Sequence, residues 1–234
     1  MPVPRRPEEQ TAILDSVQPA SASPSASPSR NARRGRKTDR PLQERAVRTR
    51  ESLLEAAALT FERVGYSGAT LEEIVLHADA TKGALYFHFR SKADLAHAVL
   101  AAHYEQWERL LEDAGAAGLD AYDTLGFVVH TLARANQSDP IARAGVRLGD
   151  EREQLEHDAP TPPVDWVDYV TKLLRRGQRD GSVRRDVSSA ASARVVVASF
   201  YGVDRMSARQ TGRDDLLKRV DEWWTMLRSS LQAL

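Results

Sequence analysis

The stretch from Ala69 to Phe89, A-T-L-E-E-I-V-L-H-A-D-A-T-K-G-A-L-Y-F-H-F, constrains the fold most, because it predicts two short helices with almost nothing between them. Thr70 can cap the first helix, and Glu73 three residues later completes the pattern of a capping box. Thr81, just after a tight Asp79-Ala80 connection, can cap the second helix. Four apolar residues at helical spacing predict the buried face of the first helix: Leu71, Ile74, Val75 and Ala78.

The second helix carries different kinds of residue at its two ends, as a helix that enters the major groove of DNA must. It begins with Lys82-Gly83-Ala84, small or hydrogen-bonding residues that let the backbone approach the base pairs. It closes with apolar residues, of which we assign Phe87 and Phe89 to the core and not to stacking. The backbone N–H groups at its start also suit phosphate oxygens. The pair is therefore interpreted as a helix-turn-helix that reads DNA.

The sequence around this pair carries a more specific pattern. It consists of R-x-x-L-L-E-A-A-x-x-x-F from Arg50 to Phe61, G-Y-S-G-A-T-L-E-E-I at 65–74 and K-G-A-L-Y-F-H-F-x-S-K at 82–92. Over the run from Arg48 to Leu100 the chain resembles the tetracycline-repressor (TetR) family. The resemblance implies an all-α fold, with an N-terminal three-helix helix-turn-helix domain followed by a larger helical domain for ligand binding and dimerisation.

The chain is expected to divide into three parts. Residues 1–41, rich in Pro, Ser and Ala and then in Arg, predict a disordered tail with a basic arm; residues 42–90 are the DNA-binding domain and 91–234 the ligand-binding and dimerisation domain. The whole chain holds 33 Lys and Arg against 33 Asp and Glu, yet nine basic residues lie between Arg30 and Arg50 against Asp39 and Glu44. The arm either contacts phosphates and the minor groove or remains a solvated tail.

Capping and breaking residues predict the remaining helices. The first should run from about 42 to 64 and end at Gly65, and Ser91 should cap the fourth, which continues to about 113 as a lever between the two domains. A helix should begin at Asp139-Pro140, and another after Pro162-Pro163 that ends at Gly177. The other expected helices are 120–136, 188–210 and 214–234, and no strand is predicted.

Candidate DNA-binding residues come from the helix-turn-helix, the basic arm and the helix starts. In the family that the chain resembles, the tyrosine and histidine of Y-F-H-F contact the DNA backbone, so specificity must come partly from the first residues of the helix. Tyr86 as a simple core residue is the alternative. The candidates are Arg36, Lys37, Arg48, Thr70, Thr81, Lys82, Gly83, Ala84, Tyr86, His88 and Lys92.

The ligand candidates depend on a narrower resemblance. The resemblance lies in the K-G-A-L-Y-F-H-F motif, in D-P-I-A-R-A-G-V-R-L at 139–148 and in a tryptophan just after a proline-containing loop. In these stretches the chain resembles the γ-butyrolactone receptors of antibiotic-producing bacteria, and a close sub-branch of these receptors senses alkyl-hydroxymethyl-furan carboxylic acids. The matching tryptophan, Trp166, is the first candidate; a core role is its alternative. Thr161 either bonds the ligand or caps a turn. Weaker candidates, from helical faces that could converge, are Phe127, His130, Val146, Leu148, Val170, Phe200 and Tyr201.

The last two helices carry more apolar surface than one core needs, including adjacent Trp223 and Trp224. Adjacent residues point about 100° apart on a helix, so one tryptophan can face its own core and the other a partner. The resemblance implies a homodimer through these two helices, which would read a pseudo-palindromic double-stranded operator. The alternative places both tryptophans in a monomeric core.

Other classes of function find little support in the sequence. Motifs of metalloproteases, P-loop enzymes, α/β-hydrolases and dinucleotide-binding enzymes are missing, so we expect no enzyme, no cofactor and no metal. The chain holds no cysteine and no apolar run long enough for a membrane helix, so no membrane partner and a cytoplasmic location are expected. The intact K-G-A-L-Y-F-H-F motif and the basic arm argue against the hypothesis of a structural protein that keeps a degenerate DNA-binding head.

The expected function is that of a transcriptional repressor that a small signalling hormone, a γ-butyrolactone or an alkyl-hydroxymethyl-furan carboxylic acid, releases from its operator. It would control antibiotic biosynthesis and its own locus. A multidrug- or antibiotic-sensing repressor of an efflux gene is the alternative, although drug-cation pockets need buried carboxylates and the apolar faces of the fifth to eighth helices carry few acids. A ligand with a carboxylate would need a positively charged partner, and Arg143 and Arg147 are the candidates near enough in the sequence.

Overall fold

The computed structural model describes residues 35–155 and 158–233, and for 35–42 only the backbone. The chain divides into two compact units, 1–42 and 43–234, which are described separately. In the first, the backbone of residues 35–42 is helical. The expected tail up to residue 34 and the side chains of Arg36 and Lys37 lie outside the described residues, so these predictions remain predictions.

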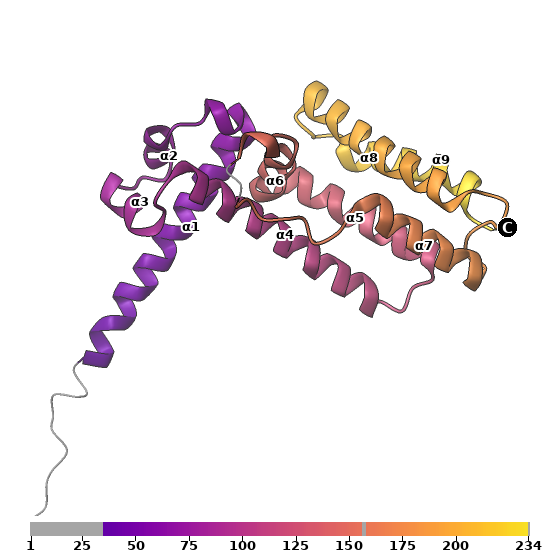
Figure 1. Cartoon of the computed structure of the whole chain (residues 1–234), viewed down its shortest axis with the longest axis horizontal. Helices are drawn as coiled ribbons and strands as arrows, with labels where there is room; N and C mark the ends of the chain where they lie inside the picture. Colours follow the sequence, from indigo (N-terminus) through magenta and orange to yellow (C-terminus); the bar gives the residue numbers. More distant parts are fainter. Residues whose placement is uncertain (1–34, 156–157, 234) are drawn as a thin grey trace, which may run out of the picture. The chain divides into compact units, whose positions relative to one another are not determined.

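The described part of the chain is all-α, as the sequence predicts, and its only strand-like feature is an isolated bridge between Val183 and Gln232. None of the helices described there is long and apolar enough to cross a membrane. In chain order (Figure 1), the helices are α1 (Gly35–Gly68), α2 (Leu71–His77), α3 (Lys82–His88), α4 (Lys92–Ala116), α5 (Ala121–Ser138), α6 (Pro140–Asp150), the short η1 (Arg152–Gln154), α7 (Trp166–Asp180), α8 (Ser189–Thr211) and α9 (Leu216–Leu231).

Side-chain caps set most of the helix starts. The Ala84 N–H donates to Thr81 Oγ1 (3.1 Å) at the start of α3, and the Asp94 N–H donates to Ser91 Oγ (3.0 Å) at the start of α4. Thr70 likewise accepts from the Glu73 N–H. The second half of the predicted capping box does not form, because the Glu73 carboxylate pairs with the Arg63 guanidinium across the α1–α2 corner.

Helix ends differ from the predictions where packing competes with local sequence. The first helix begins at Gly35, earlier than expected, while a positive φ of 75° at Gly65 interrupts it at the predicted position. The seventh begins at Trp166, capped by Asp165, and not directly after the two prolines. It continues past Gly177, where an added Cβ would lie 2.4 Å from Val183, to the left-handed Gly181. Gly177 is therefore a packing glycine inside the helix and not its end.

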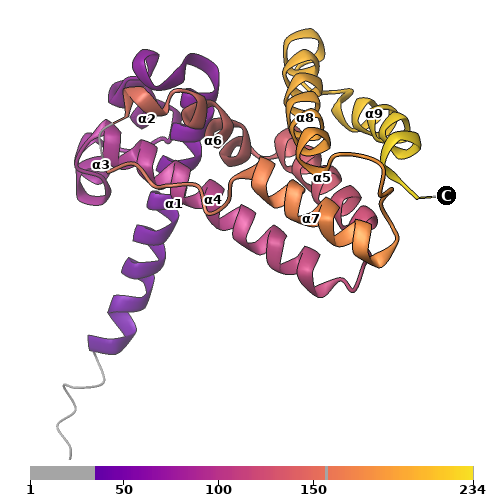
Figure 2. The same cartoon turned by 45° about the vertical axis from the view of Figure 1, so that its right-hand side comes forward.

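Two main cores lie in the second unit. The first joins α1, α2 and α3 to α4 and α6, and its most deeply buried side chains include Leu53, Phe61, Ile74, Leu85 and Leu148. The second joins α5, α7, α8 and α9 through residues such as Leu125, Leu174 and Leu216. Figures 1 and 2 both place α8 and α9 side by side. Because Leu148 belongs to the first core, α6 links the helix-turn-helix head to the helical body.

One aromatic assignment from the sequence is wrong. Phe89 is buried, but Phe87 is 79% exposed, because it lies two residues from buried Leu85 and therefore points away from the core. The half-buried Trp224 ring stacks on Tyr122, with centroids 4.8 Å apart, while the neighbouring Trp223 is buried in the second core. The apolar side chains that α8 and α9 do expose are Val195, Tyr201, Met206 and Met226.

Candidate functional site

The outer surface of α3 presents most of the predicted DNA-binding residues. Lys82 and Gly83 are exposed at its first turn, and Tyr86 is 57% exposed one turn later. The Lys82 ammonium donates to Glu72 Oε1 (2.9 Å), which raises the pKa of Lys82, but both side chains are so exposed that the pair can open at little cost. A Cβ on Gly83 would contact only Thr81, at 3.9 Å, so no neighbour in the protein requires the glycine. The missing side chain leaves room for a partner outside the protein.

The remaining DNA candidates have mixed environments. Arg48, Thr70 and Thr81 are exposed, whereas Ala84 and His88 are half-buried. Lys92 is engaged inside the protein: its ammonium donates to the carbonyls of Tyr66 (2.8 Å) and Ala69 (3.1 Å) and lies over the Tyr66 ring. Lys92 therefore holds the α1–α2 corner and is withdrawn from the proposed DNA surface.

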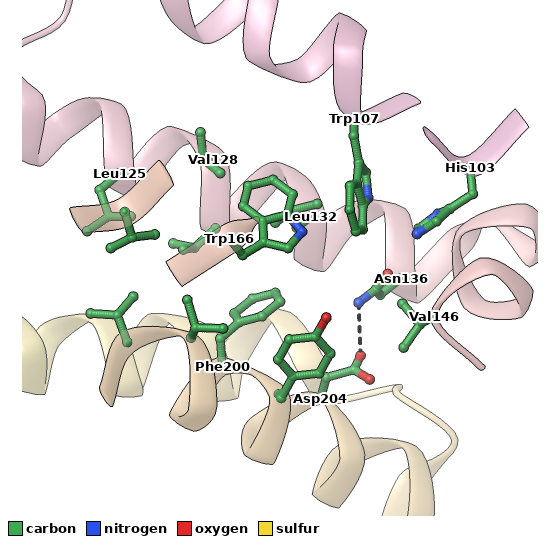
Figure 3. A pocket seen from close by; sticks show the side chains of 15 residues that line it. His103, Trp107, Leu125, Val128, Leu132, Asn136, Val146, Trp166, Phe200 and Asp204 are labelled. Carbon is green, nitrogen blue, oxygen red and sulfur yellow. Dashed lines mark hydrogen bonds between the residues drawn. The ribbon is translucent and has the colours of Figure 1, made fainter. Parts of the chain in front are cut away.

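A chamber in the helical body is the second part of the candidate site (Figure 3). It has an empty volume of about 630 Å³, part of it open to solvent. Side chains from α4, α5, α6, α7 and α8 form its wall: His103, Trp107, Leu125, Val128, Val129, Leu132, Asn136, Val146, Trp166, Val170, Val196, Val197, Phe200, Tyr201 and Asp204. We call this space the inner chamber. Its wall is mostly apolar, with a few polar groups, which is the usual composition of a small-molecule site.

Five of the nine ligand candidates line the inner chamber, namely Trp166, Val146, Val170, Phe200 and Tyr201. Trp166 is half-buried and meets Trp107 edge-on, with ring centroids 4.9 Å apart. It also faces a second, outer space of about 1050 Å³ that is open to solvent and is lined by Pro162, Arg152 and Tyr104 among others. Trp166 therefore stands between the inner chamber and the solvent-facing side.

The other four ligand candidates lie elsewhere. Leu148 is fully buried in the first core, and Phe127 packs beside the chamber against Leu110 and Ala114. His130 has its ring nitrogens 2.7 Å from the Gly126 carbonyl and 3.0 Å from Asp221. Thr161 is exposed on the loop before α7 and lines none of these spaces. For Leu148, Phe127 and His130, helical periodicity gives the right elements but not the faces that converge.

The sequence prediction missed the polar side of the chamber wall. His103 and Trp107 come from α4, which the sequence indicates only as a lever, and Asn136 and Asp204 come from α5 and α8. Polar residues on otherwise apolar helix faces are the signal that could have identified them. Of the few acids on these helix faces, Asp204 is 2% exposed and lines the chamber.

Two of the buried polar residues of the chamber, Asp204 and His103, differ in their hydrogen bonding. The Asp204 carboxylate accepts from Arg213 through Nε (3.0 Å) and Nη2 (3.1 Å) and from Asn136 Nδ2 (3.3 Å). The His103 side chain is 3% exposed, and its Nδ1 has no hydrogen-bond partner among the residues that the structure describes. Burial lowers the pKa of His103 to about 4, although the Asp139 carboxylate opposes the shift, so the ring is neutral at neutral pH.

A network of charged residues joins this chamber to α1. Arg213, which holds Asp204, lies 3.7 Å from Glu62 on α1, and Arg143 Nε donates to the same carboxylate (2.6 Å). One turn further along α6, Arg147 donates to the Glu62 carbonyl (2.7 Å) and to Glu151. Both arginines of α6 therefore hold the end of α1 and neither lines the inner chamber.

Two family profiles match separate parts of the chain. Residues 53–99 match the profile of bacterial regulatory proteins of the tetR family, and residues 119–232 match a tetracyclin repressor-like C-terminal domain. The A-factor receptor protein of Streptomyces griseus is 36% identical over 189 residues, which are 81% of this chain and 66% of that protein, just under two thirds of its length.

Solved structures resemble the chain over a similar extent. CprB from S. coelicolor A3(2) matches with a TM-score of 0.71 and 34% identity, over 81% of this chain and 91% of that one. CprB in complex with its biological operator sequence matches with a TM-score of 0.65 and 32% identity, over 80% and 90%. A γ-butyrolactone receptor described as ArpA-like matches with a TM-score of 0.68 and 33% identity, over 81% and 90%.

Proposed function

The chain belongs to the tetR family of bacterial regulatory proteins, and on that premise we propose that a small uncharged signalling molecule of the γ-butyrolactone type releases it from its operator. As a TetR-type transcriptional repressor it is a DNA-binding regulator and not an enzyme. Regulators of this family bind operator DNA and small-molecule ligands and act as dimers. The proposal concerns the ligand, the residues that bind it and the genes under control.

The inner chamber carries the proposal. It lies between α4, which continues from the DNA-binding head, and the helices α5, α7 and α8 of the body. Its mostly apolar wall with a few polar groups has the composition of an ordinary small-molecule site. A γ-butyrolactone with an alkyl chain offers the apolar surface and the few hydrogen-bonding atoms that such a wall can match.

The charges around the chamber favour a neutral ligand over a furan carboxylic acid. Among the described residues, no lysine or arginine lines the inner chamber, so an anionic ligand would find no charged partner in its wall. Burying an unpaired carboxylate there would cost several kcal/mol. A cationic drug is disfavoured as well, because Arg213 already neutralises Asp204 through two hydrogen bonds. The efflux-gene alternative therefore has the weaker support.

The DNA-binding role rests on α3 and its surroundings. Lys82 and Tyr86 can reach phosphates or base edges from exposed positions, Gly83 allows close approach, and Arg48 on α1 adds a positive charge. In a dimer, two copies of α3 would read two half-sites of a pseudo-palindrome. The exposed apolar residues of α8 and α9, Met206 and Met226 among them, are candidates for the dimer contact.

Release would follow from a population shift. The dimer favours a spacing of its two heads that fits the operator, and a ligand beside Trp166 and Trp107 favours a different tilt of α4. A coupling of about 1–3 kcal/mol between the two sites would make a useful switch. Control of antibiotic biosynthesis is part of the proposal, because a solved structure that is 36% identical to this chain concerns the control of antibiotic production by bacterial hormones.

A gel-shift on the DNA upstream of the protein's own gene tests the proposal. The protein–DNA complex is titrated separately with an alkyl butyrolactone and an alkyl furan carboxylic acid, and we expect release by the butyrolactone alone. Release by the acid alone would contradict the inference that the chamber disfavours a charged ligand. Release by neither would indicate that the ligand is a drug or an antibiotic. Lys82→Ala should weaken the shift, whereas Lys172→Ala on α7, whose exposed ammonium pairs with Asp168, should not.

A further inference from the structure

We propose that His103 is the hydrogen-bonding group that anchors the head group of an uncharged ligand in the inner chamber, with the ligand's alkyl chain directed toward Leu125 and Val128. The inference rests on the proposed function, since it requires that the chamber bind a ligand. It adds a specific recognition residue and an orientation, neither of which the helix-turn-helix or the overall fold implies.

The first argument is the unsatisfied hydrogen-bonding capacity of His103. A buried polar atom without a partner costs about 1–3 kcal/mol, so such atoms are rare in native cores. The Nδ1 of His103 is such an atom, and its side chain lines the inner chamber, the outer space and a third space beside Asn136. Nδ1 itself is enclosed in this structure, so a ligand with a carbonyl or hydroxyl group would supply the missing partner once the wall beside the ring moves aside.

The second argument is that packing, and not hydrogen bonding, fixes the ring. Gly145 of α6 leaves the space that the ring occupies, because a Cβ there would lie 2.2 Å from the His103 Cγ. The Trp107 ring meets the imidazole edge-on, with centroids 4.8 Å apart. An apolar side chain would fill this site without an unsatisfied nitrogen, so stability alone does not account for a histidine.

The third argument is the distribution of polarity along the chamber. Figure 3 shows His103, Asn136 and Asp204 toward one end and Leu125 and Val128 toward the other. Asn136 uses its amide nitrogen for Asp204, and its carbonyl oxygen is left to accept from a hydroxyl. An amphiphilic ligand would therefore place its polar head at the His103 end and its alkyl chain at the Leu125 end.

The fourth argument concerns the charge of the head group. Neutral imidazole has one N–H donor and one lone pair, so it suits a carbonyl or a hydroxyl. Because no lysine or arginine among the described residues lines the inner wall, a carboxylate head group would be buried there without a charged partner. The ligand class is thus an uncharged oxygen-bearing head group with an alkyl chain.

The test compares two probes on three full-length proteins. The probes are an alkyl butyrolactone and the corresponding alkyl tetrahydrofuran, which lacks only the carbonyl oxygen. The proteins are the wild type, His103→Gln and His103→Leu. Binding is followed by the fluorescence of Trp107 and Trp166 in the chamber wall, and each protein is also assayed for operator release and for its unfolding temperature.

We expect the wild type to bind the lactone about tenfold more tightly than the tetrahydrofuran. His103→Gln, which keeps a hydrogen-bonding group, should retain part of this preference. His103→Leu should bind both probes equally, and it should unfold at the same temperature as the wild type or higher because it removes an unsatisfied buried nitrogen. A merely structural histidine would lower the affinity for both probes together and would lower the unfolding temperature.

The outcomes separate the two proposals. If the wild type is released by the lactone but His103→Leu keeps the full preference for the lactone, the role of His103 is refuted and the proposed function stands. If the wild type binds neither probe, the proposed function fails, and the assignment of His103 falls with it. Should His103→Leu fail to fold, His103→Phe, which keeps a ring in the same space, replaces it: loss of the preference supports the assignment, and an undiminished preference overturns it.

Discussion

At the scale of single residues, the chamber contrasts two ways of burying a polar group. Asp204 is a buried charge with three hydrogen bonds, two of them from one guanidinium, which offsets much of its desolvation cost. His103 is buried as a neutral group with one nitrogen unmatched among the described residues. A buried ion pair of the first kind fixes structure, whereas an unmatched neutral group leaves a hydrogen bond open for a ligand.

The lowered pKa of His103 predicts an acid-sensitive step in stability. The unfolded chain binds a proton on this residue below about pH 6.5, but the folded protein does so only below about pH 4. Between these values the unfolded state holds the extra proton, so the free energy of unfolding falls as the pH falls and the loss is complete below about pH 4. Urea unfolding of wild type and His103→Leu at about pH 7 and about pH 5 measures the effect.

The wild type should lose more unfolding free energy between these two conditions than His103→Leu does. His130→Leu, which removes a histidine outside the chamber, is the control for the general effect of losing a titratable ring. Parallel losses in the wild type and His103→Leu would show that His103 is not buried in its neutral form.

At the scale of elements, local sequence accounts for where helices begin better than for which faces they bury. Thr81, Ser91 and Asp120 each accept from a backbone N–H three residues later, so these starts follow from side-chain chemistry that the sequence displays. The sequence also predicts a helix end at Gly177, because glycine is common at helix ends. The actual role of this glycine depends on Val183, which packs against it from the loop after the helix.

Two glycines of α6 provide a matched test of packing between elements. Gly145→Ala should destabilise the protein by about 1–3 kcal/mol, because the new methyl group would overlap the His103 ring of α4. Gly149→Ala should be neutral or stabilise by up to about 1 kcal/mol, because no atom lies within 4 Å of its Cβ position. Urea unfolding compares the two variants.

Gly145→Ala should also weaken the binding of the butyrolactone by displacing His103, while Gly149→Ala serves as the control for a methyl group added to the same helix. Equal stability of the two variants would mean that α4 and α6 can separate without cost. That result would contradict the packing described for His103.

At the scale of the whole second unit, Glu62 connects the ligand chamber with the DNA-binding head. Its carboxylate accepts from Arg143 of α6 and lies near Arg213, the residue that holds Asp204 in the chamber wall. Glu62 itself belongs to α1, which packs on the helix-turn-helix. A ligand that moves Asp204 would therefore change a contact made by the head.

Glu62→Gln should reduce the factor by which the butyrolactone weakens operator binding. The amide keeps the shape but loses the charge shared by the two arginines, so a coupling of about 1–3 kcal/mol should shrink while the butyrolactone and the operator each still bind alone. Operator affinity measured with and without saturating butyrolactone gives this factor. Glu105→Gln, whose carboxylate makes an exposed pair with Arg109 on α4, is the control. An unchanged factor in Glu62→Gln would exclude the Glu62 contact as the connection.

The amino-acid sequence by itself determined the helix-turn-helix, the all-α class and most helix starts. These features depend on caps, glycines and apolar spacing within about twenty residues, where the chain's neighbours in sequence are also its neighbours in space. It also placed Trp166, Val146 and Val170 on the elements that enclose the chamber.

Only the tertiary structure decided which faces converge. The pairing of Arg213 with Asp204 and Glu62 and the close approach of His103 to Gly145 depend on how distant helices pack. Helical periodicity defines a face to within a broad sector but does not say which neighbour covers it. For that reason the polar end of the chamber, with its unmatched histidine, became visible only when five helices from different parts of the chain were brought together.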